Sequence, residues 1–130
     1  MTNQTTPAEQ LAAELAELPH QTSAAKTLAR DPERITSGKI GGAANAIVGV
    51  LFPGRTAPPE WWRTPLGLWC AADPTLGVRS LRIKQVEAAG ILGIAPGSVA
   101  VMCHRETLDC TSDGVLMGPV LDRLVERGVA

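Results

Sequence analysis

Residues 86–104 constrain the fold more than any other part of the sequence. A small residue, Ala89, is followed four positions later by Gly93, and this spacing is what two short helices need where they cross closely and turn. The apolar residues expected to join the two helices are Val86, Leu92, Ile94, Val99 and Met102. Pro96 suits the first turn of the second helix, because the N–H that proline lacks would have no partner there. The pattern predicts a helix-turn-helix.

A β-hairpin and a final helix are predicted directly after this segment. Asp113 and Gly114 stand between two short apolar stretches, which is a strong signal for a tight hairpin. Pro119 is then expected to begin a helix that ends near Gly128. A hairpin that follows a helix-turn-helix is called a wing, so the sequence predicts a winged form of the motif.

Helices are also predicted in the N-terminal part of the chain, after a tail of residues 1–6 that is expected to be disordered. The spacing of apolar residues predicts helices over residues 7–18, 23–30 and 35–51. Thr6 can cap the first of these helices, and Thr36 or Ser37 can cap the third.

The proline- and glycine-rich residues 53–59 form the best candidate boundary in the chain. They separate an N-terminal helical region, residues 7–56, from a second domain of residues 57–130. In the second domain Thr64 and Pro65 predict the start of another helix, with Trp62, Leu66 and Trp69 on one face. The tryptophans are therefore expected to pack in the core.

Composition favours helices as the main structural element. Hydrophobic residues make up 45% of the chain but aromatic residues only 3%, so the core must consist largely of Leu, Ile, Val and Ala. The expected fold is mostly α. It has an N-terminal helical portion, followed by a winged helix-turn-helix with a short two-stranded β-hairpin.

The segment AAGILGIAPGSVAVMCHRETL, the predicted hairpin and the closing VLDRLVERG resemble the winged helix-turn-helix of MerR-type regulators and phage excisionase-like proteins. The preceding WWRTPLG stretch is similar to one found in actinobacterial and actinophage regulators. The resemblance covers roughly residues 57–127. It implies sequence-specific binding to double-stranded DNA by a transcriptional regulator, similar to a phage immunity repressor, that acts by covering an operator.

In such motifs the solvent-exposed face of the second helix reads the major groove. The candidate DNA-contacting residues on this face are Pro96, Gly97, Ser98, Ala100, Val101 and His104. None is Arg, Asn or Gln, so this face cannot make bidentate contacts with guanine or adenine. Ser98 can bond a base edge, and Ala100 or Val101 can touch a thymine methyl group.

Contacts with DNA phosphates must therefore come from residues around the helix. The candidates next to the motif are Arg79, Arg82, Lys84 and Arg105. Residues 20–63 carry six Lys and Arg against three Asp and Glu, a local charge of +3. Within them Arg34, Ser37 and Lys39 are candidates for a second DNA contact, because residues 37–39 are expected at a helix start, where N–H groups bind anions.

Several classes of function are not expected. A net charge of −1 argues against a histone-like protein. The three cysteines, Cys70, Cys103 and Cys110, contain no CxxC pair, so we expect free thiols in a cytoplasmic protein and neither a metal site nor another cofactor. No nucleophile is paired with a base, so we expect no enzymatic activity. The longest apolar run, residues 43–52, is too short to cross a membrane.

Two alternatives to a regulator stay open. An excisionase-like factor would bend DNA during recombination. A protein-interaction module built on the same motif would explain an apolar second helix and an acidic hairpin tip at Asp113. The sequence also leaves open whether the protein is a monomer or a homodimer.

Overall fold

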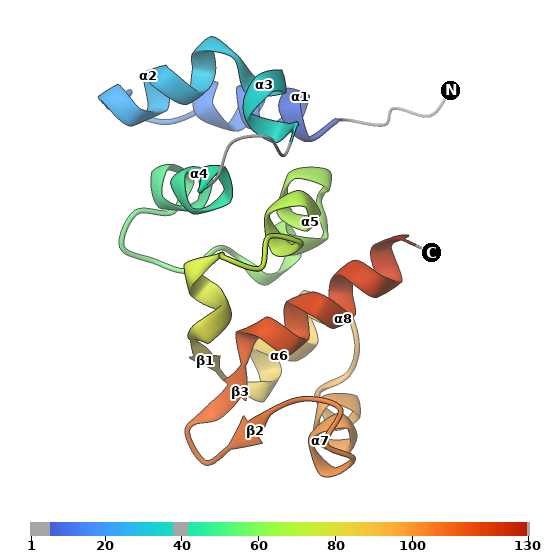
Figure 1. Cartoon of the computed structure of the whole chain (residues 1–130). Helices are drawn as coiled ribbons and strands as arrows, with labels where there is room; N and C mark the ends of the chain where they lie inside the picture. Colours follow the sequence, from blue (N-terminus) through green and yellow to red (C-terminus); the bar gives the residue numbers. More distant parts are fainter. Residues whose placement is uncertain (1–5, 38–41, 130) are drawn as a thin grey trace.

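The computed structural model describes residues 6–37 and 42–129. This part of the chain is mostly helical and contains a small three-stranded antiparallel sheet. Figure 1 shows an elongated molecule built in layers. Helices α1 to α3 lie at one end, α4 and α5 lie in the middle, and α6, α7, the sheet and α8 form the other end.

The N-terminal helices begin at the caps that the sequence provides. The bounds of these helices are α1 (Pro7–Ala16), α2 (Ser23–Arg30), α3 (Pro32–Thr36) and α4 (Ala43–Leu51). The Thr6 hydroxyl accepts a hydrogen bond from the N–H of Glu9 at 3.1 Å, which confirms it as the cap of α1. Thr22 caps α2 in the same way, through the N–H of Ala25.

The prediction of one helix over residues 35–51 is wrong. Ile35 belongs to the short helix α3, which starts because the Asp31 carboxylate accepts from the N–H of Arg34 and Pro32 occupies the first helical position. Helix α4 starts separately after Gly42, whose φ of 78° is left-handed. The Asp-Pro pair ends one helix and also begins the next.

The tryptophans lie in and beside the middle layer. A 3-10 helix, η1 (Pro59–Arg63), precedes α5 (Pro65–Ala71), and the Thr64 hydroxyl caps α5 through the N–H of Gly67, as predicted. Trp61 and Trp62 are buried, whereas Trp69 is half-buried. Trp62 lies in η1 and not in the helix that carries Trp69, which differs from the prediction.

A polar cluster joins α1 to the start of α5. The Gln10 amide donates to the Thr64 hydroxyl at 2.8 Å and to the Glu14 carboxylate at 3.0 Å. Its carbonyl oxygen accepts from the N–H of Leu66 at 2.8 Å. The Glu14 carboxylate also accepts from the indole N–H of Trp61. The N-terminal helices are thus tied by side-chain hydrogen bonds to the Trp-bearing layer.

The C-terminal end combines short helices with the sheet. The elements after α5 are η2 (Gly77–Ser80), β1 (Arg82–Ile83), α6 (Gln85–Leu92), α7 (Pro96–His104), β2 (Cys110–Thr111), β3 (Gly114–Leu116) and α8 (Met117–Val129). The strand order is β1-β3-β2. The predicted hairpin of β2 and β3 is therefore confirmed. The third strand, β1, was not predicted, because a strand of two residues leaves no pattern in the sequence. Helix α8 starts at Met117, two residues earlier than predicted.

Glycine is required at the start of β3 by the approach of β1. Gly114 has a φ of 128°, and a Cβ at this position would lie 2.5 Å from the carbonyl oxygen of Ile83. The hairpin turn itself consists of Ser112 and Asp113, because Thr111 and Gly114 are paired in the sheet.

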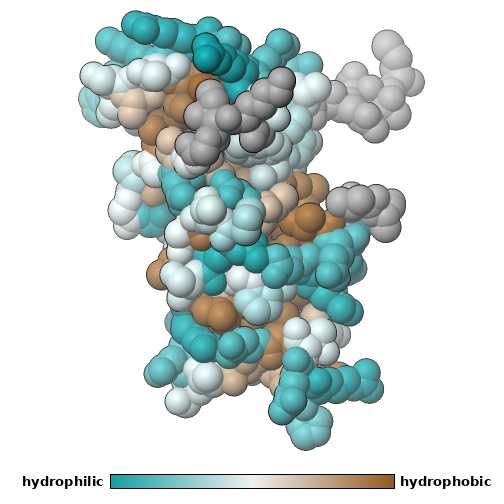
Figure 2. All heavy atoms as spheres, in the orientation of Figure 1, coloured by the Kyte–Doolittle hydropathy of each residue, from teal (hydrophilic) through white to brown (hydrophobic). Residues whose placement is uncertain are grey.

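Buried apolar side chains from both sides of residues 53–59 form one continuous cluster. It runs from Leu11 of α1, through Trp62 and Leu66, to Leu121 of α8. On the face drawn in Figure 2, apolar residues reach the surface in separate patches between polar ones. No single helix in residues 6–37 and 42–129 is long and apolar enough to cross a membrane. Helices α6 and α7 reach that length and composition only together, and they are bent by 107°.

Candidate nucleic-acid interface

Helices α6 and α7 are joined by a sharp turn at Gly93. The two helices are bent by 107° relative to each other. Gly93 has φ and ψ of 68° and 35°, and its N–H bonds to the carbonyl of Ala89. Ala89 is 2% exposed and also accepts from the N–H of Ile94 at 3.0 Å. The pairing of a small residue with a left-handed glycine four positions later is therefore confirmed.

The contacts that hold this helix pair differ in part from the prediction. Leu92 and Val99 are buried and Ile94 and Met102 are half-buried, as expected for residues that join the helices. Val86, however, is 61% exposed. It lies in the first turn of α6, where the helix has not yet reached the core, and the buried residues of α6 are Ala88, Ala89, Ile91 and Leu92.

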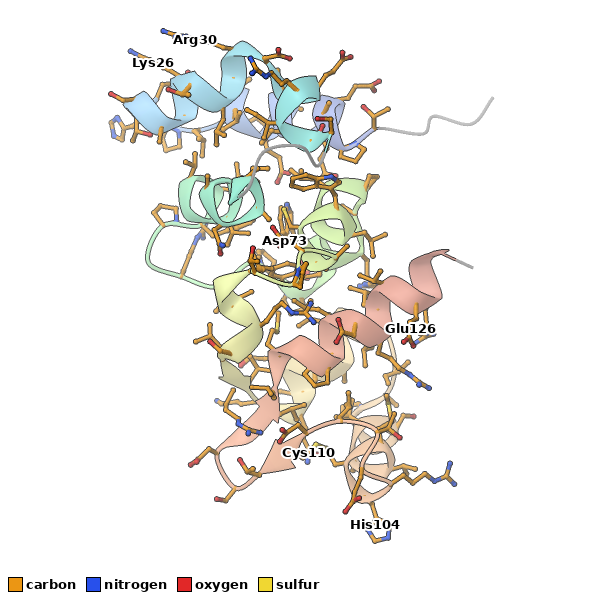
Figure 3. The ribbon with its side chains drawn as sticks, in the orientation of Figure 1. Lys26, Arg30, Asp73, His104, Cys110 and Glu126 are labelled. Atoms are coloured by element: carbon orange, nitrogen blue, oxygen red, sulfur yellow. A yellow bond between two sulfur atoms is a disulfide. The ribbon has the colours of Figure 1, made fainter. Side chains whose placement is uncertain are left out.

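The outer face of α7 is fully accessible. The predicted groove-facing residues Pro96, Gly97, Ser98, Ala100, Val101 and His104 are all exposed. His104 projects from the far end of the molecule (Figure 3). Residues 95–105 include no Asp or Glu, and most of the exposed side chains are small. A Cβ built on Gly97 would meet no atom within 4 Å, so this face can approach a flat or grooved surface closely.

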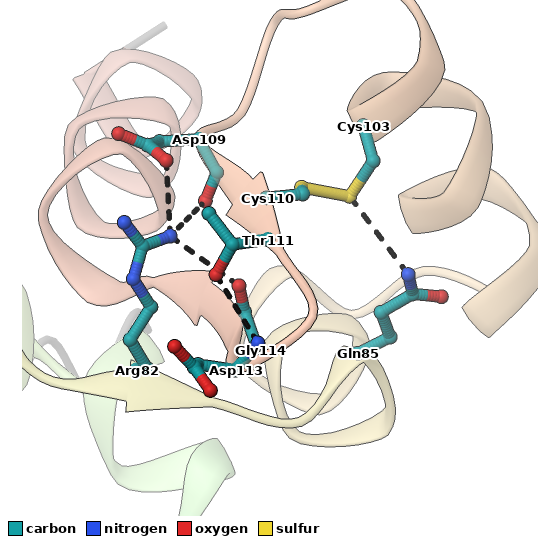
Figure 4. The surroundings of a disulfide bond; sticks show 8 residues. All are labelled: Arg82, Gln85, Cys103, Asp109, Cys110, Thr111, Asp113 and Gly114. Carbon is teal, nitrogen blue, oxygen red and sulfur yellow. Dashed lines mark hydrogen bonds and ion pairs between the residues drawn. A yellow bond between two sulfur atoms is a disulfide. The ribbon is translucent and has the colours of Figure 1, made fainter.

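Two of the arginines predicted to bind phosphate are already engaged within the protein. Arg79 forms an ion pair with Asp122 and donates to the carbonyl of Ala71 at 2.9 Å. Arg82 donates to the carboxylate of Asp109 at 2.9 Å and to backbone carbonyls of Asp109 and Gly114 (Figure 4). These guanidinium groups brace α8 and the hairpin, and neighbouring carboxylates neutralise their charges.

Of the four cations predicted next to the motif, Lys84 and Arg105 form no ion pair within the described residues. Both are exposed. Lys84 immediately precedes α6, and Arg105 immediately follows α7. Gln85, which follows Lys84, lies 4.0 Å from the sulfur of Cys103 in the last turn of α7, so both cations lie toward the C-terminal end of α7.

The tip of the hairpin is acidic. Ser112 and Asp113 are exposed, and the N–H of Asp113 bonds to the hydroxyl of Thr111 at 3.2 Å. A carboxylate at this position repels a phosphate. The tip is therefore unsuited to the DNA backbone.

The N-terminal candidates lie far from α7. Arg34 and Ser37 belong to α3 and its C-terminal end, which is at the opposite end of the molecule from α7 (Figure 1). Ser37 follows the last turn of α3 and donates to the carbonyl of Arg34 at 2.6 Å. The expectation of an anion site at a helix start is wrong for Ser37, because the C-terminal end of a helix is negative. Lys39 lies outside the described residues.

The expectation of three free thiols is also wrong. Cys103 and Cys110 form a disulfide with a Cα–Cα distance of 5.5 Å (Figure 4). Cys70 is a free, buried cysteine. Burial, reinforced by the charges of Asp73 and Glu14, raises the pKa of its thiol to about 12. Among the residues that the structure describes, no cluster of three or more His, Cys, Asp or Glu could hold a metal ion.

Comparison with protein families, with curated proteins and with solved structures found no match to this chain. What the protein does must therefore be argued from its own geometry. The features that bear on function are the accessible face of α7, the exposed cations Lys84 and Arg105 near its C-terminal end, and the adjoining hairpin.

Proposed function

We propose that this chain is a winged helix-turn-helix protein that binds double-stranded DNA in a sequence-specific manner and regulates transcription. In this proposal α7 enters the major groove. The observation that carries the proposal is the outer face of α7, which is exposed, composed of small side chains and free of carboxylates.

Base reading by α7 would be modest. Ser98 would bond a base edge or a phosphate, and Ala100 or Val101 would contact a thymine methyl group. Small side chains bring the helix backbone close to the bases, so the shape of the groove would add to the selectivity. The β2–β3 hairpin would act as a wing beside the duplex, with its Asp113 tip turned away from the phosphates.

Lys84 and Arg105 would contact phosphates near the C-terminal end of α7. Each neutralised phosphate contributes about −0.9 to the slope of log K against log salt. Two such contacts therefore predict a shallow slope of about −2. Binding of this kind would regulate by covering an operator, because the protein would block access of other proteins to that sequence.

The test is a titration of a fluorescent duplex from the region upstream of the protein's own coding sequence, compared with a random duplex, over a range of salt concentrations. Ser98→Ala should reduce the preference for the native duplex. Arg105→Ala should weaken binding to both duplexes and lower the salt slope by about 1. Arg30→Ala is the matched control, since Arg30 lies on α2 at the other end of the molecule (Figure 3).

Equal affinity for the two duplexes would contradict the proposal, as would binding that neither Ser98→Ala nor Arg105→Ala alters. A bent complex in a circular-permutation assay would instead favour an architectural factor of the excisionase kind.

A second candidate function is binding of a protein partner. It is favoured by the exposed valines of the helix pair, Val86 at 61% and Val101 at 48%, together with the acidic hairpin tip. An apolar helix face is a common docking surface for proteins. Loss of a protein complex, but not of DNA affinity, in Val101→Ser would support this candidate over the first.

A further inference from the structure

Helix α7 is anchored to the body of the protein by few side chains. Val99 is the buried residue of α7, whereas α6 buries four residues and α8 buries Met117, Val120, Leu121 and Leu124. The element against which α7 packs extensively is α6. The free energy that holds α7 in place by apolar burial is therefore small compared with that of its neighbours.

A covalent bond supplements this narrow contact. Cys103 lies in the last turn of α7 and Cys110 is the first residue of β2. Their disulfide ties the end of α7 to a strand at the edge of the sheet, because the strand order is β1-β3-β2. Gln85 of α6 places its amide nitrogen 4.0 Å from the sulfur of Cys103 (Figure 4).

The two cysteines border a hollow on the surface of the protein. Cys103 and Cys110 are both half-buried, and the hollow is also lined by Glu106, Thr107 and Pro119. An external thiol can therefore approach the sulfurs. Cys70 has no such access, because it is completely buried between the helices.

The segment between the two cysteines has its own contacts with the protein besides the disulfide. Glu106 has a φ of 60°, a left-handed conformation that is unfavourable for a residue with a Cβ. Leu108 is buried, and the N–H of Thr107 bonds to the carbonyl of Met102 at 2.9 Å. These contacts keep the segment attached to the protein, so the change that we expect on reduction is local.

We propose that the Cys103–Cys110 disulfide is a reversible redox site that controls how firmly the end of α7 is tied to the sheet. A thiolate of a low-molecular-weight thiol attacks one sulfur, forms a mixed disulfide and releases the other sulfur as a thiolate. A second thiol then attacks the mixed disulfide. The net change oxidises two external thiols to one disulfide and leaves Cys103 and Cys110 as thiols.

The effect of this redox site on DNA binding rests on the function proposed above. If the reduced protein holds α7 in the binding geometry about one-tenth of the time, its affinity for the duplex falls about 10-fold. The oxidised protein is then the binding form.

The experiment incubates the folded protein in glutathione buffers of increasing reducing strength. Thiols are counted with a maleimide reagent, and amide hydrogen exchange is measured by mass spectrometry. We expect Cys103 and Cys110 to become reactive together, while Cys70 stays unmodified. Exchange should rise about 10-fold in residues 96–111 and stay unchanged in α8, because local opening exposes only the released segment. Returning the protein to an oxidising buffer should restore both readouts.

A double variant, Cys103→Ser with Cys110→Ser, is the matched control. It should show the exchange pattern of the reduced protein in every buffer, with an unchanged circular dichroism spectrum. The inference is overturned if the disulfide resists reduction in the folded protein, or if reduction leaves the exchange of α7 unchanged. Absence of DNA binding in both redox forms would refute the proposed function but not the redox site, because thiol reactivity and amide exchange are measured without DNA.

Discussion

Gln10 offers a direct test of how the N-terminal helices are held to the middle layer of the molecule. The change Gln10→Ala removes three hydrogen bonds, to Thr64, Glu14 and the N–H of Leu66. A hydrogen bond contributes about 1 kcal/mol net, so three give about 3 kcal/mol as an upper value. The site is only partly buried, and water can replace part of this loss. We therefore expect the free energy of unfolding to fall by about 2 kcal/mol.

The assay is guanidinium unfolding followed by far-ultraviolet circular dichroism and by tryptophan fluorescence. Gln21→Ala is the matched control, because Gln21 makes one hydrogen bond, to the carbonyl of Leu15 at 3.0 Å. It should cost about 1 kcal/mol or less. In thermal melts the loss in Gln10→Ala corresponds to a fall of about 6–10 °C in Tm for a chain of this size.

Two results would refute this reasoning. If Gln10→Ala costs no more than Gln21→Ala, then the polar cluster does not stabilise the junction of α1 and α5. If helix signal and tryptophan signal change at different denaturant concentrations in the unmodified protein, then the buried cluster does not unfold as one cooperative unit.

Three further predictions concern single residues. Gly67→Ala should lower the free energy of unfolding by about 3 kcal/mol or more, because the new Cβ would overlap the carbonyl oxygen of Trp61. Gly49→Ala, at an open position on α4, should instead raise the free energy of unfolding by about 0.5–1 kcal/mol in the same unfolding assay. Between pH 9 and about 12 the folded chain keeps the thiol proton of Cys70 and the unfolded chain loses it. The free energy of unfolding should therefore fall with rising pH by up to about 1.4 kcal/mol per unit, and urea curves of Cys70→Ala should lack this contribution. Val86→Ser should change the free energy of unfolding by less than about 0.5 kcal/mol, because Val86 is exposed. A larger loss of stability in thermal melts would show that Val86 does pack between the two helices, as the sequence predicted.

Features that depend on neighbouring residues in the sequence were predictable. The caps at Thr6 and Thr64 use hydroxyls that reach N–H groups three residues away. Gly93 adopts the left-handed conformation that the turn requires, and Pro96 begins α7. Each of these signals is local, so the rest of the fold does not alter it.

Features that depend on distant partners were not predictable. Arg79 and Arg82 look like free cations in the sequence, but Asp122 and Asp109, 43 and 27 residues away, pair with them. Val86 fits a helix-pair pattern, but whether the core reaches it depends on how α6 packs. No sequence rule identifies a two-residue strand such as β1, because its register is set by β3.

The register of β1 against β3 also affects how the protein can vary. Arg82 lies opposite Leu116 and Ile83 lies opposite Val115, so the chain that leaves β1 at Ile83 returns to pair with it at Val115, one strand spacing away, about 4.8 Å. The residues between Ile83 and Val115 therefore form a segment whose two ends are paired in the sheet and which includes all of α7. Exchange of the exposed residues Ser98, Ala100 and Val101 would alter the presented surface while leaving the buried Val99 and the Cys103–Cys110 disulfide in place. Variation at these exposed positions would therefore leave the fold intact, whereas substitutions at Ile83 or Val115 would disturb the pairing of β1 with β3.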